Sequence, residues 1–113
     1  MKTIKITNLA HLKRVLQEGA EYQMVMHKTH PESVGLIRKV SFVQTNGVYS
    51  KSKDQPNHKY SLCNYGKGTF LEFCKASHYV FGDTVKFLYG KHKEVLYEFA
   101  VLDTSNNEVT SNA

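Results

Sequence analysis

The sequence predicts an α+β fold in which one N-terminal helix packs on a curved, mostly antiparallel sheet or a small open barrel, SH3-like or OB-like, of five to six strands. Leucines are spaced as in a helix in one stretch, near the N-terminus. Along the rest of the chain, short runs either alternate between apolar and polar residues or are rich in β-branched residues. Most of these runs are joined by tight turns, and strands joined in this way are antiparallel. The 113 residues fit a single globular domain over 1–102, followed by a polar, flexible tail over 103–113.

The helix is predicted over residues 7–19. Thr7 or Asn8 can cap its free N–H groups, and Gly19 can end it in a left-handed conformation. One face of this helix carries Leu9, Leu12 and Leu16. A helix of this length is too short to be stable alone, so we expect its leucines to dock on the sheet.

A strand over 22–27 and a hairpin over 36–51 follow the helix. The hairpin is indicated by Asn46-Gly47, because a type I′ turn needs φ > 0 at both central positions. With this turn, Tyr49 lies opposite Gln44. On the first arm, alternation places Arg38 on the same face as Leu36, Val40 and Phe42, and places Lys39 and Ser41 with Ile37 and Val43. Apolar residues on both faces are typical of a central strand.

The second half contains a polar loop over 52–59, a short strand over 60–65 and a further strand over 69–73, with a bend at 75–77. The pattern over 69–81 fits neither period cleanly, so helix remains an alternative there. Two alternating runs, 84–89 and 94–101, predict a second hairpin. Its inward residues are expected to be Val85, Phe87, Tyr89, Val95, Tyr97, Phe99 and Val101.

Positive charge is concentrated in the middle of the chain. The formal net charge is +5, and the segment 36–70 alone has an excess of five, with Asp54 as its single acid. Its basic residues are Arg38, Lys39, Lys51, Lys53, Lys59 and Lys67. Such a balance favours association with a polyanion and says nothing about fold.

Aromatic residues are interleaved with these cations: Phe42, Tyr49, Tyr60, Tyr65 and Phe70. Stacking rings among phosphate-binding cations are typical of surfaces that bind single-stranded nucleic acid. We therefore expect a small non-enzymatic accessory protein that binds nucleic acid through the six basic residues, with Tyr49 and Tyr65 as stacking residues. The competing interpretation is that Phe42 and Phe70 belong to the core and the lysines only solvate the surface. An alternative function is a protein–protein adaptor, or an inhibitor of a host system, acting through a sheet edge or an apolar patch.

Other chemistry is not favoured by the motifs. Residues 64–69 resemble a phosphate-binding loop superficially, but their order is Gly-Lys-Gly-Thr and no convincing helix follows. His58, Cys63, Cys74 and His78 are possible zinc ligands that lack a Cys-x-x-Cys knuckle, so packing residues are the favoured interpretation. No carboxylate stands beside a histidine at a spacing that would orient its ring. We expect no catalytic residues, no metal and no cofactor.

Three phrases carry a family resemblance: Val43-Gln-Thr-Asn-Gly-Val-Tyr49, Asn64-Tyr-Gly-Lys-Gly68, and Lys75-Ala-Ser77 through Phe81-Gly-Asp-Thr84. They resemble small uncharacterised proteins of phages and mobile elements of Gram-positive bacteria. The resemblance implies a bacterial cytoplasm and an accessory role, with no activity attached. It agrees with free thiols and with the lack of an apolar run long enough to span a membrane.

Overall fold

One antiparallel sheet dominates the computed structural model, which describes residues 2–52 and 69–103. Its strands are β1 (Glu21–His27), β2 (Ile37–Gln44), β3 (Gly47–Ser52), β4 (Thr69–Glu72), β5 (Tyr79–Val80), β6 (Val85–Tyr89) and β7 (Glu94–Val101). In space they follow the order β4-β3-β2-β1-β7-β6-β5. The helix α1 (Leu9–Val15) precedes the sheet, and two short 3₁₀ turns, η1 (Pro31–Ser33) and η2 (Ala76–His78), interrupt its connections.

The predicted α+β class and antiparallel pairing are confirmed, whereas the count of five to six strands is wrong. The described residues form seven strands in a sheet that does not close, and assignment to an SH3-like or OB-like barrel stays a prediction. The ambiguous segment 69–81 consists of β4, η2 and β5. The strand expected over 60–65 lies outside the described residues, as do the expected loop (52–59) beyond Ser52, which ends β3, and the expected tail (103–113) beyond Asp103.

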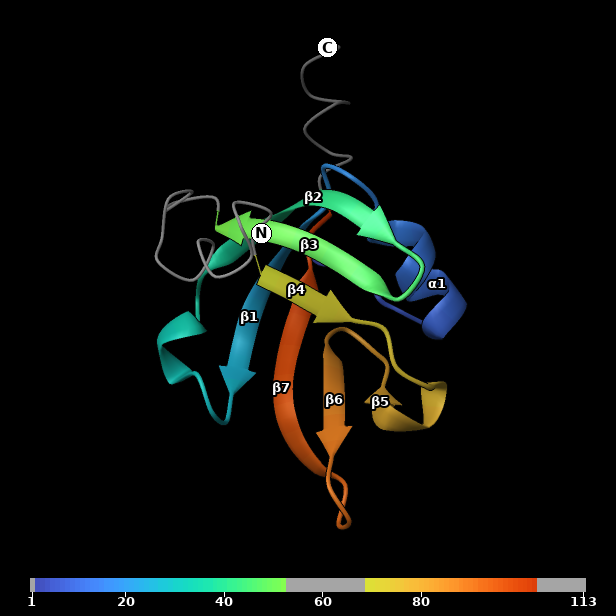
Figure 1. Ribbon diagram of the computed structural model, residues 1–113, viewed down its shortest axis with the longest axis vertical. Coiled ribbons are helices and arrows are strands. Elements are labelled where there is room, and N and C mark those ends of the chain that lie inside the picture. Colours follow the sequence, from blue (N-terminus) through green and yellow to red (C-terminus); the bar gives the residue numbers. More distant parts are fainter. Residues whose placement is uncertain (1, 53–68, 104–113) are drawn as a thin grey trace.

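The sheet is strongly curved, so that β2, β3 and β4 cross over the strands β1, β7 and β6 (Figure 1). This curvature brings the two edges of the sheet together at a seam between β4 and β5. The Tyr79 hydroxyl bridges the seam, because it accepts from the Cys74 N–H at 2.9 Å and donates to the Glu72 carbonyl at 3.2 Å. The sheet is therefore an open half-barrel whose two edges are bridged at one point by a side chain and not by strand pairing.

The core lies on the concave side, which we call the inner face. Its side chains include Tyr22, Val40, Val48, Leu71, Val85, Phe87, Phe99 and Val101. From α1 and the chain around it, Ile6, Leu12 and Leu16 join the same cluster, which confirms the predicted docking of the helix. Asn8 caps α1 by accepting from the His11 N–H at 2.8 Å, and Gly19 has a φ of 91° beyond the helix end. The helix therefore fills one end of the half-barrel.

Two irregularities change which residues face inward. The β1–β7 register shifts between Met24 and Met26, so His27, and not Met26 as strict alternation would have it, follows Tyr22 and Met24 onto the inner face. The β2–β3 register shifts between Val40 and Phe42, which separates Phe42 from its predicted neighbours Arg38 and Val40. A β-bulge has this effect because one extra residue reverses the alternation beyond it.

The predicted first hairpin is confirmed, but its turn lies one residue earlier. Gln44 pairs with Gly47, so Thr45-Asn46 is the turn, and Tyr49 lies opposite Phe42 instead of Gln44. The predicted second hairpin, β6–β7, is also confirmed. Its register shifts between Phe87 and Leu88, and Tyr89 at its open end is 65% exposed, although we predicted it as a core residue. No helix among the described residues is long and apolar enough to cross a membrane.

Candidate ligand pocket and outer basic face

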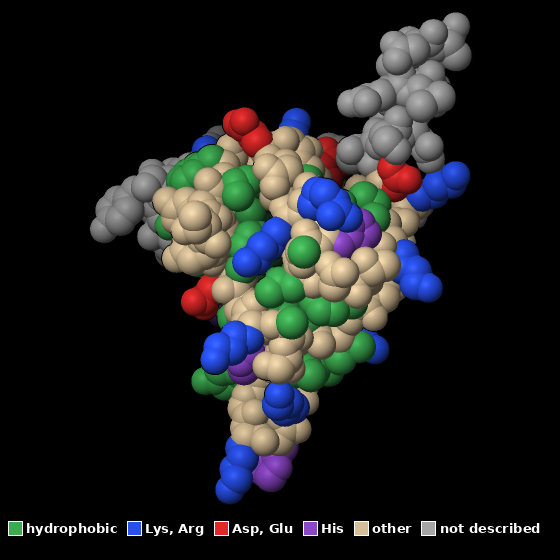
Figure 2. Space-filling view, turned by 90° about the vertical axis from the view of Figure 1, so that its right-hand side faces the viewer, with side chains coloured by type: hydrophobic (Ala, Val, Ile, Leu, Met, Phe, Trp, Pro, Cys, Tyr) green, Lys and Arg blue, Asp and Glu red, His purple; other side chains and the backbone are tan. Residues whose placement is uncertain are grey.

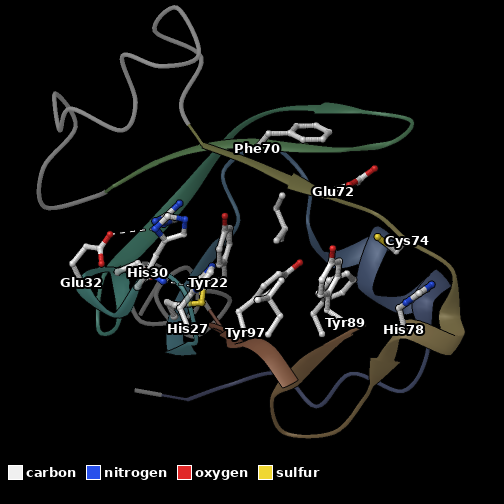
Figure 3. Close-up of a pocket in the computed structure, with 16 residues that line it drawn as sticks. Tyr22, His27, His30, Glu32, Phe70, Glu72, Cys74, His78, Tyr89 and Tyr97 are labelled. Carbon is white, nitrogen blue, oxygen red and sulfur yellow. Dashed lines mark hydrogen bonds and ion pairs between the residues drawn. The ribbon is translucent and has the colours of Figure 1, made fainter. Parts of the chain in front are cut away.

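A pocket of about 650 Å³ opens on the inner face, and its lining residues all lie outside α1. Its walls come from β1, β2, β4, β6 and β7, so residues far apart in the sequence meet here. The apolar part of its lining is formed by Met24, Leu71, Phe87, Leu96 and Tyr97. Tyr22, Tyr97 and Tyr89 rise from the floor below β4 with their hydroxyl groups toward the cavity (Figure 3).

Arg38 is the cation of this pocket. It lies directly across from Tyr22 in the β1–β2 ladder, is only 8% exposed and lines the cavity. Among the described residues the two ion pairs are Lys28–Glu94 and His30–Glu32, and neither includes Arg38. The Nε of Arg38 is buried without a hydrogen-bond partner. A buried guanidinium outside any such ion pair is unusual, because desolvating the charge is costly unless a partner replaces water.

Tyr22 supports Arg38 from the floor. Its hydroxyl shares a hydrogen bond of 2.6 Å with the buried Ser50 hydroxyl on β3. Burial raises the pKa of Tyr22, and the nearby Arg38 charge and the Ser50 bond oppose that rise. The phenol is therefore protonated at neutral pH, so Tyr22 does not act as a counter-ion for Arg38.

His27 lines the same wall and is held neutral. Its Nδ1 accepts from the backbone N–H groups of Thr29 and His30, at 3.3 and 3.1 Å. An Nδ1 that accepts leaves the proton of the neutral ring on Nε2. Burial, with smaller contributions from His30 and Arg38, lowers the pKa of His27. His27 is thus an uncharged donor near Arg38.

Four rings stack side by side along the floor of the pocket. His27 stacks on Tyr97 at 5.4 Å, Tyr97 on Phe87 at 4.9 Å, and Phe87 on His78 at 6.0 Å between centroids. Because their faces are turned to one another, these rings present mainly their edges to the cavity. Burial strongly raises the pKa of Tyr97, so its phenol is a neutral donor at physiological pH.

The pocket offers little for covalent or metal chemistry within the described residues. Burial, reinforced by Glu72, raises the pKa of the Cys74 thiol, which disfavours the reactive thiolate. Cys74 is a free, half-buried cysteine, and Cys63 and His58 lie outside the described part of the chain. No group of three His, Cys, Asp or Glu side chains that could hold a metal ion is found over residues 2–52 and 69–103.

The opposite, convex side of β2, β3 and β4 brings part of the predicted nucleic-acid site together; we call it the outer basic face. Lys39 and Lys51 lie directly across from each other in the β2–β3 ladder. Beside them Phe42, Tyr49 and Phe70 form a row of rings with centroid separations of 4.7 and 4.8 Å. Phe70 is also one of the residues that line the pocket, and in Figure 3 its ring lies above β4, away from Tyr22, Tyr97 and Tyr89 on the floor. Both faces of the Tyr49 ring are therefore turned to its neighbours, which limits its use as a stacking platform.

The structure divides the predicted site residues. Lys39, Lys51 and Tyr49 share the outer basic face, whereas Arg38 points into the pocket on the other side of the sheet. The remaining four, Lys53, Lys59, Lys67 and Tyr65, lie outside the described residues. Sequence reasoning missed the pocket, although one signal was present: an arginine placed by alternation on the same face as Val40.

Cations elsewhere are scattered. Figure 2 shows the side that carries α1, where lysine and arginine side chains stand singly among hydrophobic ones. A local group occurs at the β6–β7 turn, where Lys91, His92 and Lys93 are exposed. The positive charge of the described residues thus forms no single continuous stripe on this side of the molecule.

Comparisons with protein-family models, with curated proteins and with solved structures give no match. The resemblance to phage and mobile-element proteins therefore stays a prediction. Function has to be argued from the pocket and the outer basic face.

Proposed function

We propose that the protein is a non-enzymatic binding protein for a small, mostly apolar molecule, which it holds in the pocket of the inner face. One observation carries the proposal: a cavity of about 650 Å³ with an aromatic and aliphatic lining lies open beside the buried core. This volume lies in the range of roughly 300–1,000 Å³ of small-molecule sites, which combine apolar walls with a few polar groups. The polar groups here are Tyr22, His27, Arg38 and Tyr97.

A neutral fluorescent probe tests the proposal. N-phenyl-1-naphthylamine brightens on leaving water for an apolar site, and we expect saturable binding with micromolar affinity or better. Leu96→Trp, which puts a large side chain into the pocket, should weaken binding at least tenfold. Val25→Trp is the matched control, because Val25 is on the neighbouring strand β1 and 43% exposed, outside the pocket lining. Failure of the wild type to bind, or equal binding by Leu96→Trp, would count against the pocket.

A second candidate function is binding of single-stranded nucleic acid by the outer basic face. The specific observation in its favour is the Lys39–Lys51 pair, since like charges directly opposite in a ladder repel each other and a phosphate between them would relieve the repulsion. The row of Phe42, Tyr49 and Phe70 places aromatic rings beside this pair, which is the combination of cations and rings that single-strand binding uses.

Salt dependence distinguishes this function from diffuse attraction. Each phosphate contact to a single strand adds about 0.7 to the slope of log affinity against log salt, so Lys39→Gln with Lys51→Gln should lower the slope by about 1.4. The control is Lys91→Gln with Lys93→Gln, which removes the same charge at the β6–β7 turn. Equal losses in the two double variants would refute a site on the outer basic face.

A cytoplasmic location and the alternative function, an adaptor or inhibitor that acts through a sheet edge or an apolar patch, stay proposals. One structural observation bears on action through a sheet edge: the edges β4 and β5 are bridged to each other through Tyr79.

A further inference from the structure

We infer that the pocket selects ligands with a single carboxylate, which pairs with Arg38, on a flat conjugated body that lies across the ring edges of the floor. This inference rests on the proposed binding function and adds the chemical class of the ligand. It depends on the burial of Arg38, on the charges that line the pocket and on the orientation of the stacked rings, and not on the volume of the cavity.

Among the described residues Arg38 has no carboxylate partner, and the Tyr22 phenol with which it interacts carries no charge. Its side chain is more than nine-tenths buried, it lines the cavity, and its Nε has no hydrogen-bond partner. The ion pairs Lys28–Glu94 and His30–Glu32 do not include Arg38. A guanidinium presents a planar fork of donors that fits a carboxylate with two parallel hydrogen bonds. A ligand anion would therefore supply what the described residues leave out.

The charges of the residues that line the pocket limit the charge of the ligand. His27 is held neutral by the two backbone N–H groups that bond to its Nδ1, and Tyr22 and Tyr97 are neutral phenols. Glu32, which also lines the pocket, adds a negative charge at its edge beside His30. One buried cation near an acidic edge favours a monoanion over a phosphate dianion, which Glu32 would repel.

The stacked rings on the pocket floor favour a particular shape for the body of the ligand. The stacked row of His27, Tyr97 and Phe87 presents ring edges, which carry positive partial charge, toward the cavity. The face of an aromatic or conjugated system carries negative partial charge, so a flat ligand lying on these edges makes edge-to-face contacts. Leu71 covers the opposite side from β4. A saturated, bulky body would gain only apolar contact here.

A matched set of probes tests the inference by displacement of bound N-phenyl-1-naphthylamine. We expect 2-naphthoic acid to bind at least tenfold tighter than its methyl ester, the size of effect given by charge-assisted hydrogen bonds. It should also bind tighter than 2-naphthyl phosphate and cyclohexanecarboxylic acid. Arg38→Met should remove the preference for the acid, so that the acid and the ester bind equally within about twofold. Arg38→Lys, which keeps the charge without the planar fork, should recover only part of the preference.

A purely structural role for Arg38 gives different results. Replacing a buried charge that lacks an ion-pair partner by an apolar side chain should leave the ligand-free protein as stable or more stable, so we expect no loss of Tm in Arg38→Met. Equal binding of acid and ester would overturn the carboxylate inference and leave the pocket proposal standing. Preference for the phosphate, or for the cyclohexane acid, would overturn the charge or the shape step respectively. Absence of any binding, including that of the neutral probe, would refute the proposed function itself.

Discussion

Gly47 shows how little space separates β3 from β4. A Cβ atom at this position would lie 2.5 Å from Cζ of Phe70 and closer still to the carbonyl oxygen of Leu71. The backbone oxygen is held in the β3–β4 ladder, where Val48 pairs with Leu71, so it has little freedom to withdraw. Glycine at this position is therefore required by the close approach of the neighbouring strand.

We predict that Gly47→Ala lowers the free energy of unfolding by about 1–3 kcal/mol, the usual cost of overpacking. Urea denaturation followed by circular dichroism measures it. Gly82→Ala is the control, because the nearest atom to its Cβ would be the Thr84 oxygen at an ordinary 3.9 Å, and we expect a change within about 0.5 kcal/mol. Similar losses in the two variants would show that the β3–β4 contact is not the cause.

His27 makes the stability of the protein depend on pH. The pKa of His27 is lowered from its usual value near 6.5, so below that pH the unfolded chain takes up a proton that the folded protein resists. Stability contributed by neutral His27 is thus present above pH 6.5 and is lost as the pH falls below it. His27→Asn, whose side-chain oxygen can still accept from the backbone N–H groups, should show a shallower loss of stability between about pH 7 and pH 5. Parallel stability–pH curves for wild type and variant would contradict this origin.

At the scale of elements, the edges of the sheet meet through one phenol. Tyr79 contacts both the Cys74 N–H and the Glu72 carbonyl, and it is 8% exposed. Burial raises its pKa to about 12, which keeps the donating proton in place at any physiological pH. Because the folded pKa exceeds the usual value of 10, this contribution to stability is intact below pH 10 and declines as the pH rises toward 12.

We predict that Tyr79→Phe costs about 1–3 kcal/mol of unfolding free energy, because it leaves two backbone groups without their partner. Tyr97→Phe is the matched control: it removes the same atom from the inner face, where no hydrogen bond of the Tyr97 hydroxyl is present among the described residues. Its effect should stay within about 0.5 kcal/mol. Chemical denaturation at neutral pH compares the two, and an equally small loss for Tyr79→Phe would mean that the seam is held by other contacts.

Elements are more predictable than their faces. The helix, the two hairpins and strand β1 follow from local periodicity and turn chemistry, whereas β4 lies in a segment whose pattern left helix as an alternative. The bulges near Met24 and Val40 are single-residue shifts decided by pairing with distant strands, and each reverses the faces of the residues beyond it. For this reason, simple alternation along β2 places Phe42 on the wrong side of the sheet.

At the scale of the whole molecule, the same curvature that forms the core leaves the pocket. Counting charges along the sequence locates the basic segment, but it does not show that its cations are divided between the two faces of the sheet. Neighbouring residues of a strand point to opposite faces, so Arg38 lines the pocket and Lys39 lies on the outer basic face. The pocket walls come from five strands and are assembled only by the sheet order, which short-range patterns do not encode. Of the predicted site residues, Lys39, Lys51 and Tyr49 therefore lie on the outer basic face and Arg38 lines the pocket, which the sequence did not predict.

The sheet order also predicts how the molecule opens. β1 is the central strand of seven and β7 lies next to it, whereas β4 and β5 are the edges joined only at the seam. Local opening of a protein requires less free energy where fewer contacts must break, so hydrogen exchange should be slowest in β1 and β7 and faster in β4 and β5. Because the seam adjoins the pocket through Leu71 and Cys74, saturation with N-phenyl-1-naphthylamine should slow exchange in β4 and β5 more than in β2. Exchange measured by mass spectrometry with and without the probe tests both statements. Uniform protection of all strands would contradict opening at the seam, and protection gained only on β2 and β3 would place the probe on the outer basic face.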